Sequence, residues 1–325
     1  MPFPAATDLG VRWLLAAAGQ APSVLNTQPW RFRIVGEKSV ELLADPDRRL
    51  RVADPRGRSM HVSCGAALFN LRLAVRVSGH LPSVWALPSP EEPRLLALVR
   101  MAPFGPPTAP EQELYAAIGR RRTSREPFSD RRVPPWVLAD LRIAASREGA
   151  NLVLPTMRAA ADLLDYAAIA EEELSADHDY LAETRAWTIG GTHADGLPTY
   201  VLGPPPADDP ALVRYFGVRN ARTPERFESR PQLAVLTTPG DRPLDWLRAG
   251  QALQRVLLVA ASHGLSASFL NQPLDLRDMR HRADPRHRRG HAQMIIRFGY
   301  GPGVPRAPRR PAAELRTGDP EPSSL

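Results

Sequence analysis

The sequence predicts an α+β protein built from two similar halves. Helical patterns rich in alanine and leucine alternate along the 325 residues with short apolar strands. Two long apolar helices, residues 60–79 and 244–264, can be laid over each other without a gap. The shared positions are Gly65, Ala67, Leu68, Leu73 and Gly79, which fall on Gly250, Ala252, Leu253, Leu258 and Gly264. Chance identity between helices of this composition is the alternative, and the matching order of flanking elements favours a divergent duplication.

The first half, residues 1–102, begins with a helix over residues 7–20, for which Thr7 or Asp8 is the expected N-cap. Two short strands surround the turn at Gly36, and polar residues 45–58 form a loop. The long helix ends at Gly79, and an apolar strand covers residues 95–101. Residues 103–110 are rich in proline and glycine, so we expect a linker there.

The second half, residues 111–317, repeats this alternation. Its expected helices are 111–119, 134–147, 157–176 and 244–264, and its expected strands are 151–154, 233–236, 265–270 and 293–298. An insertion of about residues 157–230 interrupts the repeat, and beyond its acidic first helix the insertion reads as irregular. Residues 318–325 are predicted to be a disordered tail. Each half would bury its long helix against the other half.

Composition limits the function classes. No apolar run reaches the roughly 18 residues of a membrane helix, and no signal-peptide pattern opens the chain. The single cysteine, Cys64, excludes an intrachain disulfide and fits a reducing cytoplasm. Cys64 lies within an apolar helical pattern, so we interpret it as a buried structural thiol rather than a nucleophile.

The net charge of +7 would ordinarily suggest a nucleic-acid partner. Of the 42 basic residues, however, only Lys38 is a lysine, and the arginines are spread among aspartates and glutamates. This pattern is typical of a GC-rich coding sequence and of solvated surface arginine. We therefore expect no nucleic-acid partner.

The connection between the first helix and the first strand concentrates polar side chains. Pro22 and Pro29 restrict the backbone of this segment. Between them lie Ser23, Asn26, Thr27 and Gln28, which could offer donors and acceptors to the edge of a planar ligand. An ordinary helix-to-strand connection is the alternative.

A second cluster, residues 120–125, contains four arginines with Thr123 and Ser124. Guanidinium groups bind phosphate oxygens in pairs, and hydroxyls add donors, so this run is a candidate phosphate site. Solvated surface arginine is the alternative.

Two further patterns lie in the C-terminal region. The spaced glycines from Gly299 precede prolines instead of a helix, which excludes a dinucleotide fingerprint. The histidines His281, His287 and His291 stand among arginines that would repel a cation, so no metal site is predicted.

Two motifs resemble those of the nitroreductase superfamily of FMN-dependent oxidoreductases. They are Ala-Pro-Ser-x-x-Asn-x-Gln-Pro-Trp-x-Phe from Ala21 and Arg-Arg-Thr-Ser-Arg-x-x-Phe from Arg121. In ordinary members the arginine motif comes first and two identical chains pair. Here the order is inverted, which is similar to the Acg subfamily, in which one chain imitates the dimer. The resemblance implies a duplicated α/β sandwich with mixed central sheets flanked by helices and a lid insertion.

The resemblance also implies the residues of one flavin site. The phosphate would be bound by Arg121, Arg122, Thr123, Arg125, Arg309 and Arg310. The ring and ribityl chain would contact Pro22, Ser23, Val24 and Asn26, and the ring would lie beside Ser268, Phe269 and Leu270. Lid residues would include Arg185 and Trp187. The mirror-image positions lack both motifs, so we expect one FMN per chain.

The implied function is hydride transfer through flavin N5, to or from a small nitro-like, quinone-like or specialised organic substrate. No side-chain acid or base is needed, so no catalytic residue is predicted. NAD(P)H is a candidate electron donor, although a lid over the flavin would hinder a nicotinamide. The alternative is a flavin-sequestering or storage protein. Either way we expect a cytoplasmic monomer that imitates a dimer and binds no membrane.

Overall fold

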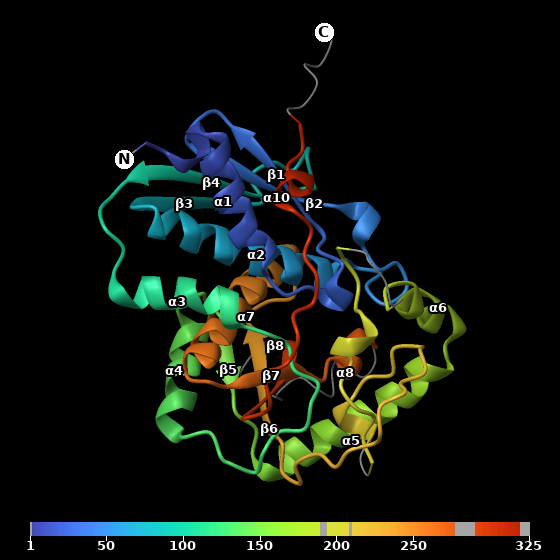
Figure 1. Cartoon of the computed structure of the whole chain (residues 1–325). Coiled ribbons are helices and arrows are strands. Elements are labelled where there is room, and N and C mark those ends of the chain that lie inside the picture. Colours follow the sequence, from blue (N-terminus) through green and yellow to red (C-terminus); the bar gives the residue numbers. More distant parts are fainter. Residues whose placement is uncertain (1, 189–193, 208–209, 277–289, 319–325) are drawn as a thin grey trace.

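A computed structural model describes residues 2–188, 194–207, 210–276 and 290–318. It contains two four-stranded sheets on opposite sides of a central pair of helices (Figure 1). The first sheet consists of β1 (Trp30–Val35), β2 (Ser39–Ala44), β3 (His80–Ala86) and β4 (Leu95–Pro103), in the order β1-β2-β4-β3. The second consists of β5 (Asn151–Val153), β6 (Gln232–Thr238), β7 (Ser266–Phe269) and β8 (His291–Gly299), in the order β5-β6-β8-β7. The α+β class is confirmed.

The helices match the expected segments closely. They are α1 (Asp8–Gly19), α2 (Arg58–Val77), α3 (Ala109–Arg120), α4 (Pro135–Ser146), α5 (Met157–Ala176), α6 (His178–Ala186), α7 (Pro243–Ser262), α8 (Gln272–Asp275) and α10 (Ala312–Leu315). Thr7 is the N-cap of α1, and its hydroxyl accepts the amide of Gly10 at 3.1 Å. Sequence reasoning missed the short helices α6, α8 and α10. Asp177 caps α6 by accepting two backbone amides. The polar composition of this segment predicts irregular structure instead of a helix.

One sheet prediction needs correction. Every pairing between the named strands of the described chain is antiparallel, so the sheets are not mixed. Parallel pairing is confined to isolated bridges, such as Thr123 with Ala267 and Phe32 with Arg316. The strand order explains this. The helix after β2 leads to β3 at the edge of the sheet, and the hairpin from β3 then places β4 between β3 and β2, antiparallel to both.

The two sheets share their strand order and their irregularities. The register of β2 on β4 shifts after Leu42, and that of β6 on β8 shifts after Leu236, at the corresponding place. The helices α2 and α7 have the same length and span corresponding residues at the offset seen in the sequence. Each is followed by a glycine with positive φ, Gly79 at +86° and Gly264 at +72°, a conformation that favours glycine.

The close crossing of α2 and α7 joins the halves. A Cβ on Gly65 would lie 2.2 Å from the carbonyl oxygen of Leu247, and one on Gly250 would lie 2.0 Å from that of Val62. The two contacts are equivalent, because their residues are related by the sequence offset of the repeat. Only glycine, which has no Cβ, lets the backbones approach this closely. Leu247 packs in the core of the first half and Val62 in that of the second. Each helix therefore completes the core of the other half.

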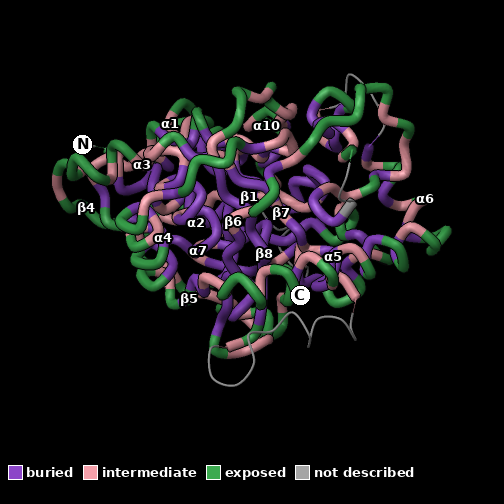
Figure 2. The backbone as a smooth tube through the Cα atoms, turned by 90° about the horizontal axis from the view of Figure 1, so that it is seen from below, coloured by how far each residue is buried: buried purple, intermediate pink, exposed green. Residues whose placement is uncertain are grey.

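Two further segments wrap around this frame. The insertion carries α5 and α6 at one end of the molecule, and the C-terminal tail runs back from β8 to the first sheet (Figures 1 and 2). Leu315 of α10 is fully buried, close to Gly19 of α1. The amide of Thr317 donates to the carbonyl of Phe32 at 2.8 Å. The tail thus ties the second half to the edge of the first sheet.

We expect Gly65→Ala to lower the free energy of unfolding by about 1–3 kcal/mol or more, because the added methyl meets backbone that must move. Urea unfolding followed by circular dichroism measures this change. Gly119→Ala, in α3 with no atom within 4 Å of the added carbon, is the control and should be neutral or stabilising by up to about 1 kcal/mol. Equal effects of the two substitutions would contradict the role given to the crossing.

Candidate functional site

One open pocket lies where the two halves, the insertion and the tail meet, with an empty volume of about 1350 Å³ that includes its mouth. The first half lines it with the loop after α1 and the first turns of α2. The second half contributes the arginine run after α3, the end of β7 and Met294 of β8. Leu197 and Phe216 of the insertion and Arg309 of the tail close further sides.

The loop after α1 is held in an uncommon backbone conformation. Leu25, Asn26 and Gln28 have φ values of 44°, 55° and 49°. Such values are uncommon for residues other than glycine and often mark functional sites. Ser23 stabilises the turn, because its hydroxyl accepts the amide of Gln28 at 2.9 Å. The hydroxyl of Ser63 on α2 accepts the amide of Val24 at 3.2 Å.

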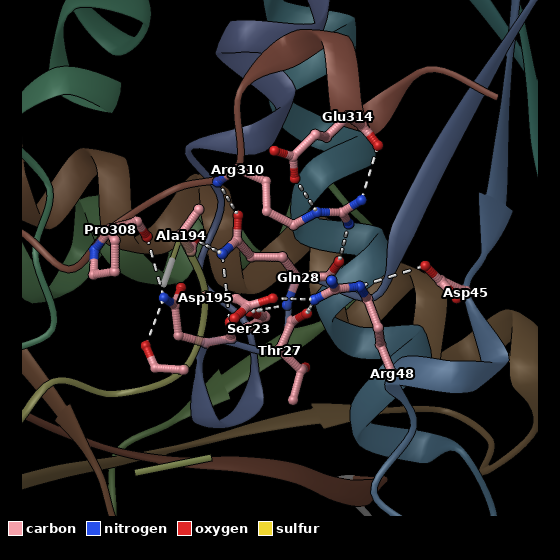
Figure 3. A network of polar contacts seen from close by, with 12 residues as sticks. Ser23, Thr27, Gln28, Asp45, Arg48, Ala194, Asp195, Pro308, Arg310 and Glu314 are labelled. Carbon is pink, nitrogen blue, oxygen red and sulfur yellow. Dashed lines mark hydrogen bonds and ion pairs between the residues drawn. The ribbon is translucent and has the colours of Figure 1, made fainter. Parts of the chain in front are cut away.

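The carboxamide of Gln28 faces the protein and not a ligand. Figure 3 shows it between the insertion and the tail, where its Nε2 donates to Ala194 O at 2.8 Å. Its Oε1 accepts the amide of Arg310 at 2.9 Å. Thr27 and Gln28 are fully buried. Neither side chain lines the pocket, so the interpretation of these two side chains as ligand-facing was wrong. The Gln28 carboxamide is bonded inside the protein, whereas the buried hydroxyl of Thr27 has no hydrogen-bond partner in the described structure.

Asn26 bonds to other parts of the protein and also lines the pocket. Its Nδ2 donates to Gly196 O at 2.8 Å and to Pro308 O at 3.1 Å, and its Oδ1 accepts from Arg309 at 2.9 Å. It also lines the pocket. Arg48 adds a second connection, since its Nη1 lies 2.6 Å from the carboxylate of Asp195 and 3.0 Å from Thr27 O (Figure 3). The loop is therefore tied to the insertion and to the tail at once.

Four arginines converge at one end of the pocket: Arg121, Arg122, Arg306 and Arg309. Within the described ranges, none of them has an ion pair with an acidic residue. Arg121 is 5% exposed, and its Nε and Nη1 are buried without a hydrogen-bond partner, as is the Nε of Arg309. Buried donors without partners are costly, so this end of the pocket is suited to an anion.

The pKa values of these arginines reflect the same crowding. Burial, with repulsion from Arg309, Arg122 and Arg306, lowers the pKa of Arg121 to about 9. Burial and repulsion from Arg306 and Arg122 lower the pKa of Arg309 to about 10. Both groups stay protonated at pH 7 and have no acidic neighbour to offset their charge. An anion with several oxygens would supply the missing acceptors.

Eleven of the predicted site residues line this pocket. They are Pro22, Ser23, Val24, Asn26, Arg121, Arg122, Thr123, Arg125, Ser268, Phe269 and Arg309. Four others do not line it: Leu270 is buried in a neighbouring core, and Arg310 bonds to Gln28 and Glu314. Arg185 is exposed, and Trp187 packs beside the apolar cluster that contains Leu25 and Phe216. The two motifs, a hundred residues apart in sequence, are thus neighbours in space.

Sequence reasoning missed several lining residues. Ser59 and Ser63 stand one turn apart on α2, and Asn271, Asp275 and Arg214 line the pocket as well. The helical spacing of the two serines was a usable signal. Nothing local distinguishes Arg214 from the other arginines of the chain.

The described residues contain neither a cluster of metal ligands nor an exposed thiol. No group of three histidine, cysteine or acidic side chains there could hold a metal ion. His281 and His287 lie outside the described residues. Cys64 is confirmed as buried; its Sγ donates to Pro29 O at 3.1 Å, and burial raises the pKa of its thiol. No helix in the described part of the chain is long and apolar enough to span a membrane.

Comparisons with known proteins found relatives over almost the whole chain. "Putative NAD(P)H nitroreductase Rv3131" of Mycobacterium tuberculosis is 33% identical over 322 residues, which are 94% of this chain and 90% of the relative. "Uncharacterized protein Rv3127" of the same organism is 32% identical over 90% of this chain and 89% of its own. "Putative NAD(P)H nitroreductase acg" is 29% identical over 97% of both chains. No family model matches.

Solved structures are matched more loosely. The FMN-dependent nitroreductase NfnB from Mycobacterium smegmatis, in complex with NADPH, is 18% identical with a TM-score of 0.36, covering 62% of this chain and 96% of its own. A nitroreductase with bound FMN from Bacteroides fragilis is 13% identical with a TM-score of 0.36, covering 58% and 89%.

We expect Arg121→Met to raise the unfolding free energy of the ligand-free protein by about 1–3 kcal/mol at pH 7, because a buried unpaired charge is removed. The native-state pKa of Arg121, about 9, lies below its ordinary value. The penalty in the unmodified protein is therefore full below pH 9 and fades as the pH rises above it. Urea unfolding at pH 7 and pH 10 measures both effects. The exposed Arg120→Met is the control, and a destabilised Arg121→Met protein would refute the assignment.

Proposed function

The chain belongs to the nitroreductase superfamily, given its 33% identity across 90% of a mycobacterial relative, and we propose that it is an FMN-binding oxidoreductase acting on a small organic substrate. The observation that carries the proposal is the group of four arginines at one end of the pocket, where Arg121 is buried without an acidic partner. A flavin phosphate is a dianion with the acceptors this group lacks.

The rest of the pocket suits a planar ring. Val24, Val62 and Phe269 supply apolar surface, while the hydroxyls of Ser23 and Ser63 already serve loop amides. These side chains would position the ring and exclude water from it. When bound, FMN supplies reversible hydride acceptance at N5. Arg125, whose Nη1 donates to Val201 O at 3.0 Å, would keep a positive charge beside the ring.

We propose a single site per chain, composed of both halves of a duplicated, dimer-like monomer. The halves are residues 1–102 and 111–317, joined by the linker 103–110, with the lid inserted at about 157–230. At the position that mirrors the loop after α1, α4 connects to β5 through only residues 147–150. This segment lacks the serine of its counterpart. Its one positive φ is that of Gly149, which adopts such values without strain.

The purified protein should bind about one FMN per chain, and Arg121→Gln or Arg309→Gln should weaken FMN by on the order of 10–100-fold. Riboflavin has the same ring without the phosphate, so its affinity should change little in either variant. Quenching of flavin fluorescence measures both constants. Arg120→Gln, on the exposed end of α3, is the matched control.

Equal losses for FMN and riboflavin would contradict the phosphate assignment while leaving flavin binding intact. Failure of the unmodified protein to bind either flavin would overturn the proposed function. Two FMN per chain would refute the single composite site.

A flavin-sequestering protein is the second candidate, favoured by the way the lid is fastened over the pocket. The carboxylate of Glu183 on α6 accepts the backbone amides of Arg51, Val52 and Ala53, the last at 2.8 Å. The Asn26–Gly196 and Arg48–Asp195 contacts fasten the lid at a second place. Such a lid would slow a nicotinamide that must stack on the flavin.

Anaerobic reduction of the bound flavin distinguishes the two functions. For an oxidoreductase gated by the lid, we expect slow bleaching by NAD(P)H that Glu183→Ala accelerates several-fold, because one fastening is lost. Stopped-flow absorbance gives the rate, and the exposed Glu173→Ala on α5 is the control. A flavin that neither protein reduces with either nucleotide would favour sequestration, or an enzyme whose own substrate supplies the electrons.

A further inference from the structure

The pocket is lined by a further positive group besides the four arginines. This group belongs to Arg214, on the lid after the short turn Pro210–Leu212. Its Nη2 lies 2.6 Å from the carboxylate of Asp275, and the two side chains are 13% and 8% exposed. Asp275 is also 3.7 Å from Arg58, so two guanidinium groups share one carboxylate.

Most N–H groups of Arg214 make no hydrogen bond in the described structure. Its one hydrogen bond in the described structure is the bond to Asp275, and its remaining N–H groups are not among the buried atoms without partners. Because Arg214 lines the pocket, these groups have access to its interior. Asp275 fixes the direction of the guanidinium. Burial lowers the pKa of Arg214, but Tyr180, Asp275 and Glu171 outweigh burial and keep that pKa above the ordinary value.

A second cation shares this space. Burial and repulsion from Arg214 lower the pKa of Arg125 to about 10. Arg125 has no ion pair among the described residues; its guanidinium donates to Val201 O and stands over the ring of Phe216, 5.2 Å from its centroid. Two like charges therefore act on each other within the pocket, and an anionic group between them would stabilise both.

Resting on the proposed flavin site, we propose that the part of the pocket lined by Arg214 and Arg125 binds the anionic group of a small planar substrate, with Arg214 as its specificity-determining contact and a carboxylate as the group bound. Leu212, Val213 and Phe216 supply apolar surface next to Arg214, which suits an aromatic or unsaturated body. The hydroxyl of Ser59 at the start of α2 is a further polar group of the pocket. The substrate class would thus be aromatic or conjugated acids rather than neutral compounds.

The test compares benzoate with benzyl alcohol, two redox-inert probes that differ in the charged group. Their dissociation constants for the flavin-loaded protein are measured by calorimetry. We expect benzoate to bind more tightly, and Arg214→Met to reduce this preference by on the order of 10-fold or more, since a charge-assisted hydrogen bond is lost. Arg214→Lys should retain part of it. The exposed lid substitution Arg219→Met should retain all of it.

Turnover gives a second measurement. Among reducible probes, 4-nitrobenzoate should exceed 4-nitrobenzyl alcohol in kcat/KM, and Arg214→Met should remove that ratio mainly through KM. Flavin content, read from visible absorbance, should be unchanged in all three variants.

Three outcomes would overturn the inference: no benzoate preference in the unmodified protein, an unchanged preference in Arg214→Met, or a loss of stability in that variant with the preference intact. The last result would assign Arg214 to fastening the lid alone. A protein that holds no flavin would instead overturn the proposed function, so the two failures are distinguishable.

Discussion

The close backbone contact between the halves, Gly65 of α2 against Gly250 of α7, is the constraint on which the site depends. It sets where the first turns of α2 stand relative to β7 and α8, and residues of all three elements line the pocket. The exchange of Val62 and Leu247 between the two cores makes the arrangement cooperative, because neither core is complete without the other helix.

Electrostatics oppose this packing at the pocket's positive end. Arg121 and Arg309 are held close together and away from water, with lowered pKa values. The apolar cores offset that cost, which explains why the cluster stands on edges of well-packed elements: Ser124 donates its amide to Ala267 O of β7 at 2.9 Å. Next to it, the buried ion pair of Arg297 with Glu228 holds Phe128, whose amide Glu228 accepts at 3.0 Å. Stability and anion binding are therefore coupled in this protein.

Sequence periodicity predicted most helices and strands because each buries one apolar face. The two motifs and their inverted order predicted that distant segments meet. The direction of polar side chains was not predictable: Gln28 has the same local sequence whether its amide faces a ligand or, as here, Ala194 and Arg310. Arg214 was missed for a related reason, since only the long-range contact with Asp275 separates it from solvated arginine.

The loop after α1 connects the lid to the positive cluster of the pocket. Asn26 bonds to Gly196 of the lid and, through the same carboxamide, to Arg309 of the positive cluster. Displacing the lid would break the first bond and release the side chain that orients the second. The strained φ angles of Leu25 and Asn26 oppose holding this position without those partners. A lid that opens would thus loosen the arginine cluster, whereas a bound anion, by fixing Arg309, would favour the closed lid. Cofactor retention and substrate entry would then be alternatives set by one side chain.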